Sequence, residues 1–293
     1  MVFIDTEGKF NDNSYLIDAI LFRTLHDLSL YVIENEGSRM LIDTGSSFES
    51  AKIARKLKEF NLLPIHKVIL THSHWDHVQG YRKLKNKIGE FETLASEKAI
   101  DNLKNPKRMN EPFQINVEPI ENVVSLKEGD IIDLEGLELE VFNFFGHTQD
   151  HIALLDRKNK NIFTGDAIMC KYDLQTFRPT FMPPDFNESE LLKTFKKLRG
   201  IKDEIHSISM AHFGVWKDEE LDFIINSMEE VHFTTKKAMI EWYNENSDID
   251  YITRKYHETF IPNSKKHKKE NIIGLLLPIS WHIESLKISG SIK

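Results

Sequence analysis

The sequence predicts a mixed α/β (α+β) fold followed by a helical C-terminal subdomain. Over the first two thirds of the 293-residue chain, short runs of branched and aromatic residues alternate with segments of helical periodicity. After Trp216 almost every segment has helical periodicity. The length exceeds one typical domain but falls short of two full-sized ones. We therefore expect a main domain over residues 1–215 and a smaller helical subdomain over residues 216–293.

The N-terminal part alternates strands with helices. Short apolar runs predict strands at Tyr15–Ile20, Leu28–Ile33, Arg39–Asp43, Val68–Thr71 and Phe91–Leu94. Phe48–Phe60 places Ile53 and Leu57 on one face and lysines on the other, which predicts a helix. Further helices are expected from near His77 and over Ser96–Leu103.

The middle of the chain is typical of antiparallel strands joined by turns. A meander is expected from three runs, Val123–Leu126, Ile131–Leu134 and Leu137–Phe145, with a glycine in each connecting turn. His151–Asp156 and Asn161–Thr164 predict a hairpin. The proline-rich, aromatic segment Cys170–Phe186 is expected to be a long ordered loop.

The remaining elements are mainly helices. Asn187–Leu198 predicts a helix with Asn187 as its N-cap, and Ile205–Met210 predicts the last strand. Three further helices are expected beyond it, Lys217–Asn246, Asp248–Phe260 and Asn271–Leu286, the last two separated by the polar linker Asn263–Glu270.

Composition and charge narrow the class of protein. The formal net charge of -8 disfavours, without excluding, a nucleic-acid-binding surface, since such a surface needs a basic face. The one strong basic cluster, residues 265–269, is interpreted as a solvated loop. A single cysteine, Cys170, excludes an intrachain disulfide. With neither a signal-peptide pattern nor an apolar run of about 20 residues, we expect a cytoplasmic protein with no membrane association.

A cluster of metal-ligand residues follows the predicted strand Val68–Thr71. His72 and His74 are two residues apart at a strand end, so both side chains project from the same face and can bind one ion. Asp76 and His77 follow at the turn into a helix and can serve a second ion. Imidazole and carboxylate ligands suit zinc, and also iron or manganese. Three histidines and one aspartate within six residues argue against a chance surface cluster.

Three further candidates also stand at strand ends. His147, Asp166 and His212 each follow a predicted strand. One such residue is most often a cap or surface group, but the repeated placement favours a shared site. His151 is a candidate to orient a neighbouring ligand. The other histidines are interpreted as surface or core residues: His26, His66, His206, His232, His257, His267 and His282.

The order of these motifs resembles the metallo-β-lactamase superfamily. The pattern HxHxDH is followed by GHT at Gly146–Thr148, by TGD at Thr164–Asp166 and by His212, and Asp43-Thr44-Gly45 matches an early strand end of that family. The resemblance covers about residues 10–215. It implies a four-layer αββα sandwich for the main domain.

The resemblance also implies a binuclear site with two Zn²⁺ ions per chain, iron or manganese being alternatives. By match, His72, His74 and His147 would hold the first ion, and Asp76, His77 and His212 the second. Asp166 would bridge the two ions. Asp43 would support a ligand histidine from behind.

Two features depart from the family pattern. The usual GHTPGH reads Gly146-His147-Thr148-Gln149-Asp150-His151 here, so the turn after His147 can differ. Zinc β-lactamases often use a cysteine ligand, whereas Asp166 takes that place and Cys170 lies four residues later. We interpret Cys170 as a loop or core thiol.

The expected activity is that of a metal-dependent hydrolase. A metal-bound hydroxide would cleave a thioester, ester or lactone-type bond in a small-molecule substrate, because such ions lower the pKa of bound water to about 7. Asp76 is a candidate proton shuttle, Tyr172 a candidate hydrogen-bond donor to an oxyanion, and the 170–186 loop a candidate pocket wall. The ligand set resembles that of glyoxalase II-like enzymes and of acyl-homoserine-lactone lactonases, which favours this reaction.

Alternative functions remain open at this stage. A nuclease or phosphodiesterase stays open because the tail ending at Gly290 resembles the HLxxLxxxG ending of some relatives. A mononuclear-iron persulfide dioxygenase also shares the fold and the first-ion histidines. A flavodiiron role is rejected, since that family typically has glutamate where His74 stands. A vestigial binding module is disfavoured because every ligand position is filled, and the tail is a candidate for homodimer formation.

Overall fold

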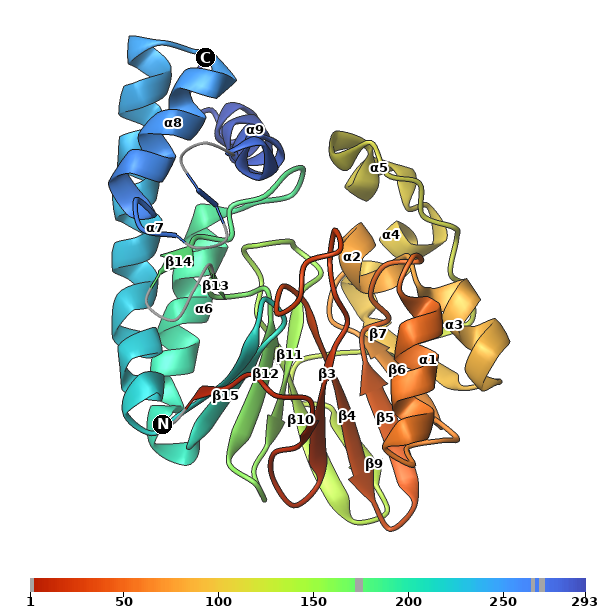
Figure 1. Ribbon diagram of the computed structural model, residues 1–293. Coiled ribbons are helices and arrows are strands. Elements are labelled where there is room, and N and C mark those ends of the chain that lie inside the picture. Colours follow the sequence, from red (N-terminus) through yellow and green to blue (C-terminus); the bar gives the residue numbers. More distant parts are fainter. Residues whose placement is uncertain (1–2, 172–175, 265–266, 269–271) are drawn as a thin grey trace.

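Two large β-sheets face each other in the computed structural model, with helices on both outer faces (Figure 1). The structure describes residues 3–171, 176–264, 267–268 and 272–293. Tyr172 and three lysines of the basic cluster, Lys265, Lys266 and Lys269, lie outside these ranges. Among the described helices, none combines the length and apolar character that crossing a bilayer requires.

The first sheet holds the strands of the N-terminal part. Its order along the sheet is β2 (Gly8–Lys9), β3 (Ser14–Asp18), β4 (Ser29–Asn35), β5 (Ser38–Ile42), β6 (Lys67–Leu70), β7 (Glu92–Ser96) and β8 (Val123–Leu126). The strands β5 to β8 are mutually parallel. Their carboxyl ends therefore meet at one edge of the sheet.

The second sheet is built mostly from later strands. Its order is β1 (Phe3–Ile4), β16 (Gly214–Lys217), β15 (Ser207–Met210), β12 (Asn161–Gly165), β11 (Ile152–Asp156), β10 (Leu137–Asn143) and β9 (Ile131–Leu134). Only β12 and β15 pair in parallel; the other described pairs are antiparallel.

Successive side chains of a strand point to opposite faces of its sheet, and both faces are buried. In β4, Tyr31 and Ile33 pack in the core between the sheets, while Leu30 and Val32 pack toward the helices. The helices α1 (Ser50–Glu59) and α3 (Tyr81–Ile88) cover the first sheet, and α6 (Glu188–Gly200) and α7 (Glu219–Glu245) cover the second (Figure 1). The predicted four-layer αββα sandwich is thereby confirmed.

Short helical segments connect the strands. They are α2 (Trp75–Val78), η1 (Glu97–Ala99), α4 (Ile100–Lys104), α5 (Lys107–Asn110), η2 (Glu111–Phe113) and η3 (Lys202–Glu204). The helix α6 begins as predicted, because the Asn187 side chain accepts a hydrogen bond from the Glu190 amide.

The C-terminal helices form a smaller apolar cluster of their own. Residues from the end of α7, from α8 (Ile249–Phe260) and from α9 (Ile273–Ile288) pack together with Phe181. The first half of α7 packs instead on the second sheet through Ile224 and Met228. The apolar contacts therefore change partner within α7, and the division near Trp216, which falls in β16, stays a prediction.

Three predicted elements differ in the structure. Val123–Leu126 does not extend a meander, because β8 pairs in parallel with β7 of the other sheet. Ile205–Met210 is not the last strand, since β16 turns back on β15 through Gly214, whose φ is +91°. The 170–186 segment contains two paired two-residue strands, β13 (Cys170–Lys171) and β14 (Phe177–Arg178). Pairing partners and very short strands are decided by tertiary contacts, which local sequence patterns do not encode.

Candidate metal centre

The seven candidate ligands meet at one edge of the sandwich. Four follow β6 directly, and the others follow β10, β12 and β15: His72, His74, Asp76, His77, His147, Asp166 and His212. All are buried to at least nine tenths, with Asp76 the most exposed at 9%. Because the carboxyl ends of strands from both sheets converge here, Asp76 and His212, 136 positions apart, become neighbours.

Three histidines form one half of the cluster. Ring nitrogens of His72, His74 and His147 all lie within 4.8 Å of one another. His147 Nδ1 donates to the Thr180 carbonyl at 2.6 Å, which turns Nε2 toward the cluster. Burial lowers the pKa of His72 well below its usual value, that of His74 to about 3, and that of His147. These imidazoles are therefore neutral, the form that binds a cation.

Two histidines and a carboxylate form the other half. Ligand atoms of Asp76, His77 and His212 also lie within 4.8 Å of one another, and His212 Nε2 is 3.3 Å from Asp76 Oδ2. Burial lowers the pKa of both histidines, but the neighbouring carboxylates, Asp166 first, outweigh it and raise each pKa well above its usual value. Burial opposes ionisation of Asp76, but His77 and His212 outweigh it and lower its pKa to about 2.

Asp166 stands between the two halves. Its Oδ1 is 3.5 Å from His77 Nε2, and its Oδ2 is 3.7 Å from His147 Nε2 and 3.3 Å from His212 Nε2. Despite burial, the charges of His212 and His77 hold the pKa of Asp166 well below its usual value. A carboxylate that contacts both halves has the position expected of a bridging ligand.

Asp43 supports the cluster from behind. Its Oδ2 accepts from His77 Nδ1 at 2.7 Å and from the Thr71 hydroxyl at 2.8 Å, while Oδ1 accepts from the Thr71 amide at 2.8 Å. Parallel pairing of β5 with β6 places the end of one strand beside the end of the other. The bond orients the ring of His77, so that its Nε2 faces the cluster.

The donor set fits a cation. Four buried atoms find no hydrogen-bond partner among the described residues and belong to the cluster: Nε2 of His72, His74 and His77, and Oδ1 of Asp166. Buried polar atoms are nearly always satisfied, so a group of unsatisfied ligand atoms indicates a missing partner. Neutral imidazole nitrogens together with carboxylate oxygens are the ligands that zinc-class ions take.

Two glycines allow the close packing around the cluster. A Cβ on Gly146 would lie 2.4 Å from the Leu191 backbone, so the turn before His147 needs glycine against α6. A Cβ on Gly165 would lie 2.6 Å from His151 Nε2. That nitrogen accepts from the Asp166 amide at 3.0 Å, and the His151 ring stacks on His72 at 4.8 Å. His151 therefore contacts two candidate ligands without belonging to either half.

The sequence interpretation missed Asp150, which ties the two histidine loops together. This buried carboxylate accepts from the Ser73 hydroxyl at 2.5 Å, the Thr148 hydroxyl at 2.6 Å and Asn102 Nδ2 at 2.8 Å. Ser73 lies between His72 and His74, and Thr148 follows His147. The departure from the GHTPGH pattern at this position was the available signal.

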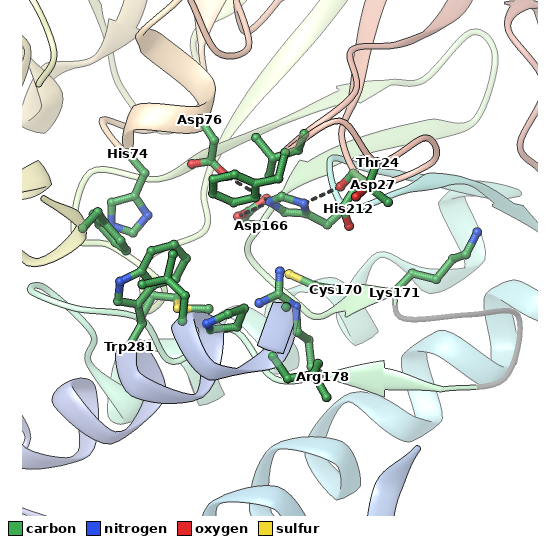
Figure 2. Close-up of a pocket in the computed structure, with 18 of the residues that line it drawn as sticks. Thr24, Asp27, His74, Asp76, Asp166, Cys170, Lys171, Arg178, His212 and Trp281 are labelled. Atoms are coloured by element: carbon green, nitrogen blue, oxygen red, sulfur yellow. Dashed lines mark hydrogen bonds and ion pairs between the residues drawn. The ribbon is translucent and has the colours of Figure 1, made fainter. Parts of the chain in front are cut away.

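A cavity of about 370 Å³ opens onto the cluster. Figure 2 shows His74, Asp76, Asp166 and His212 on one side, and Trp281 of α9 and Arg178 of β14 on the other. Cys170 also lines the cavity, and its sulfur lies within 4.8 Å of ligand atoms of Asp166 and His212. Burial raises the pKa of this thiol to about 11, so it is protonated at neutral pH.

The histidines interpreted as ordinary surface or core groups lie outside the ligand groups found among the described residues. His267 is the one of them that lines the cavity. His232 bonds Glu188 at 2.8 Å, and His282 bonds the Phe181 carbonyl at 2.9 Å. These two link the C-terminal helices to the rest of the molecule.

Solved structures share this fold. A metallo-beta-lactamase family protein from Thermus thermophilus superimposes with a TM-score of 0.63 at 17% identity, covering 95% of this chain and 94% of that one. A metallo-beta-lactamase superfamily protein from Sulfolobus tokodaii superimposes with a TM-score of 0.57 at 19% identity, covering 74% of this chain and 86% of that one.

Sequence relatives carry hydrolase names. A probable metallo-hydrolase from Streptococcus pyogenes is 26% identical over 57% of this chain and 74% of that protein. Hydroxyacylglutathione hydrolases from Haemophilus influenzae and Ruegeria pomeroyi are 27% and 30% identical over 46% and 52% of this chain, and the matches span 63% and 52% of their lengths. The family model of the metallo-beta-lactamase superfamily matches residues 25–212. Since this match covers more than half of the sequence, the chain belongs to the metallo-beta-lactamase superfamily.

Proposed function

We propose that this protein hydrolyses acyl thioesters with two zinc-class ions bound at the strand-end cluster. His72, His74 and His147 would hold one ion, Asp76, His77 and His212 the other, and Asp166 would bridge them. The observation that carries the proposal is the cluster of unsatisfied buried ligand atoms from both halves, beside a cavity that His74 and Asp166 line. The names of the hydroxyacylglutathione hydrolases support the thioester bond as the target.

The residues around the ions have separable tasks. Ions held there would supply Lewis acidity, which polarises a substrate carbonyl and lowers the pKa of water. Asp43, the Thr180 carbonyl and the Asp27 carbonyl each hold the Nδ1 of one ligand histidine, at 2.7, 2.6 and 2.6 Å respectively. Each of these bonds turns an Nε2 toward the cluster before any ion binds. Because the ligands are already oriented, less free energy is needed to order them when an ion binds.

Asp76 is the candidate to move a proton to the departing thiolate. Among the seven ligands it is the most exposed, and it lines the cavity. With its pKa lowered to about 2, it is ionised at neutral pH and could take a proton from the attacking water and pass it to the thiolate. As a ligand of the second ion it would be a weak base, so we assign it this task secondarily to metal binding.

Metal content and thiol release together test the proposal. The purified protein should contain about two zinc-class ions per chain, and thiol should be released from a hydroxyacylglutathione or a simple acyl thioester. A metal-replete protein that releases no thiol from any thioester, but cleaves a phosphodiester, would overturn it in favour of a nuclease. A single bound iron with oxygen uptake would overturn it in favour of a dioxygenase.

A further inference from the structure

The cavity beside the metal centre has an apolar wall in addition to its polar and charged groups. Its apolar side chains come from the 21–22 segment, from α2, η2 and the 170–186 segment, and from α9; they include Phe22, Trp75, Phe113, Ile273, Leu277 and Trp281. A volume of about 370 Å³ is in the range of small-ligand pockets. Its reactive wall and its apolar wall thus bound the same space (Figure 2).

Part of this lining is explained by packing alone. Trp281 packs edge-on against Phe113 at 5.0 Å, and Phe113 packs against His74 at the same distance. Both aromatic residues are buried, which is what docking α9 onto the sandwich requires. These contacts form a continuous apolar surface from a ligand histidine to the C-terminal helix.

The rim of the cavity is not explained by packing. Phe22, Ile273 and Leu277 line the cavity yet are 59%, 73% and 46% exposed. Phe22 continues the apolar surface outward, because its ring lies 5.4 Å from that of Trp75, the residue before Asp76. Exposed apolar groups gathered around a pocket mouth mark a binding surface.

We infer that the substrate carries an extended apolar acyl chain, with Phe22 and Leu277 as specificity-determining residues at the rim. The inference rests on the proposed thioesterase function and names the acyl side of that substrate. With the scissile carbonyl at the metal centre, the acyl chain follows the apolar wall and leaves between Phe22 and α9. A small polar acyl group would leave this surface in contact with water.

Chain length should therefore govern the rate. Each methylene buried against the wall raises kcat/KM by up to about fourfold, given about 0.8 kcal/mol per buried methylene. The rate constants for acetyl, butanoyl, hexanoyl and octanoyl thioesters of N-acetylcysteamine are measured below their micelle concentrations. We expect kcat/KM to rise by at least about tenfold from acetyl to octanoyl.

A pair of matched variants on α9 tests whether the cavity lining causes the dependence on chain length. Leu277→Ser should flatten the dependence on chain length, and so should Phe22→Ser, from another segment of the lining. Ile288→Ser is the control, because Ile288 lies on α9 with a similar exposure of 51% and does not line the cavity. Thermal melting of each variant checks that the fold is intact.

The outcomes separate the two proposals. Hydrolysis of all four thioesters at equal kcat/KM would overturn the acyl-chain inference and leave the thioesterase function standing. Equal flattening by Leu277→Ser and Ile288→Ser would also overturn it. No hydrolysis of any thioester by metal-replete protein would overturn the function itself.

Discussion

The sandwich and the C-terminal helices contribute different chemistry to one cavity. Loops at the strand ends, together with the short helix α2, provide all seven candidate ligands, and all seven are buried. From α9 the cavity receives chiefly apolar side chains, such as Leu277 and Trp281. Because the two sets come from separate parts of the fold, substitutions can change the apolar wall without moving a ligand. Reactivity and substrate choice are therefore expected to respond independently to mutation.

The two regions are also held together in different ways. The ligand loops are fixed by hydrogen bonds to buried carboxylates, those of Asp43 and Asp150. The helices are held by an apolar cluster and by a partly exposed contact of His232 and Lys236 with Glu188. Removing a buried partner leaves an unsatisfied polar group. This lowers the free energy of unfolding more than the loss of a partly exposed ion pair does. Substitutions in each region should therefore differ in their effects.

The largest effect is expected from removing a ligand. His74→Ala should abolish thioester hydrolysis and lower the bound metal, because one half of the cluster loses a third of its ligands. Metal analysis and thiol release measure both effects. The control His206→Ala changes an exposed histidine outside the cluster and should leave both unchanged. An active, metal-replete His74→Ala would contradict the ligand assignment.

A smaller loss is expected when a ligand loses its support. Asp43→Asn weakens the bond that orients His77 and should lower metal affinity or activity by about 10- to 100-fold. Metal titration against a competing chelator measures the affinity. Asp203→Asn, at an exposed aspartate, is the matched control. An unchanged affinity would show that His77 needs no orientation by Asp43.

The hydrogen bonds of Asp150, which link the two histidine loops, are expected to contribute mainly to the stability of the fold. Asp150→Ala leaves the hydroxyls of Ser73 and Thr148 without their buried acceptor and should lower the free energy of unfolding by about 1–3 kcal/mol. Urea unfolding of the metal-free protein measures it, which separates stability from metal binding. A variant as stable as the unchanged protein would mean that the loops are held by other contacts.

The smallest effect is expected where the helices meet the sandwich. Glu188→Gln should lower the free energy of unfolding by at most about 1 kcal/mol at pH 7, because the pair is partly exposed, and should leave metal content unchanged. Burial opposes ionisation of Glu188, but Lys236 and His232 outweigh it and lower its pKa in the folded protein. The carboxylate therefore stabilises the fold above its unfolded pKa, and this contribution is lost as the pH falls through the folded value.

Urea unfolding at pH 7 and at pH 3 tests this. The difference between Glu188→Gln and the unchanged protein should be present at pH 7 and shrink at the lower pH. A difference that grows on acidification would contradict the assigned role of Glu188. A large effect at pH 7, comparable with that of Asp150→Ala, would remove the proposed contrast between the two regions.

Local patterns predicted most helices and strands and all the ligand candidates. His72 and His74 could be recognised because their spacing repeats the period of a strand, and Asn187 because N-capping is a local interaction. The placement of β8 and the existence of β16 could not, because each depends on a partner strand distant in sequence or too short to show a pattern. Asp150 was missed for the same reason, since its three donors come from three segments.

What the sequence by itself determined is therefore the kind of chemistry, through residue types at strand ends. Only the tertiary structure decided which strand ends meet, that Asp166 touches both halves of the cluster, and that α9 lies over the cavity. The helix α7 illustrates this difference between sequence and tertiary structure. Its periodicity runs on without a break, yet its first half packs on a sheet and its second half on α8 and α9. A repeating apolar face shows that a helix is buried, and only its three-dimensional surroundings show against what.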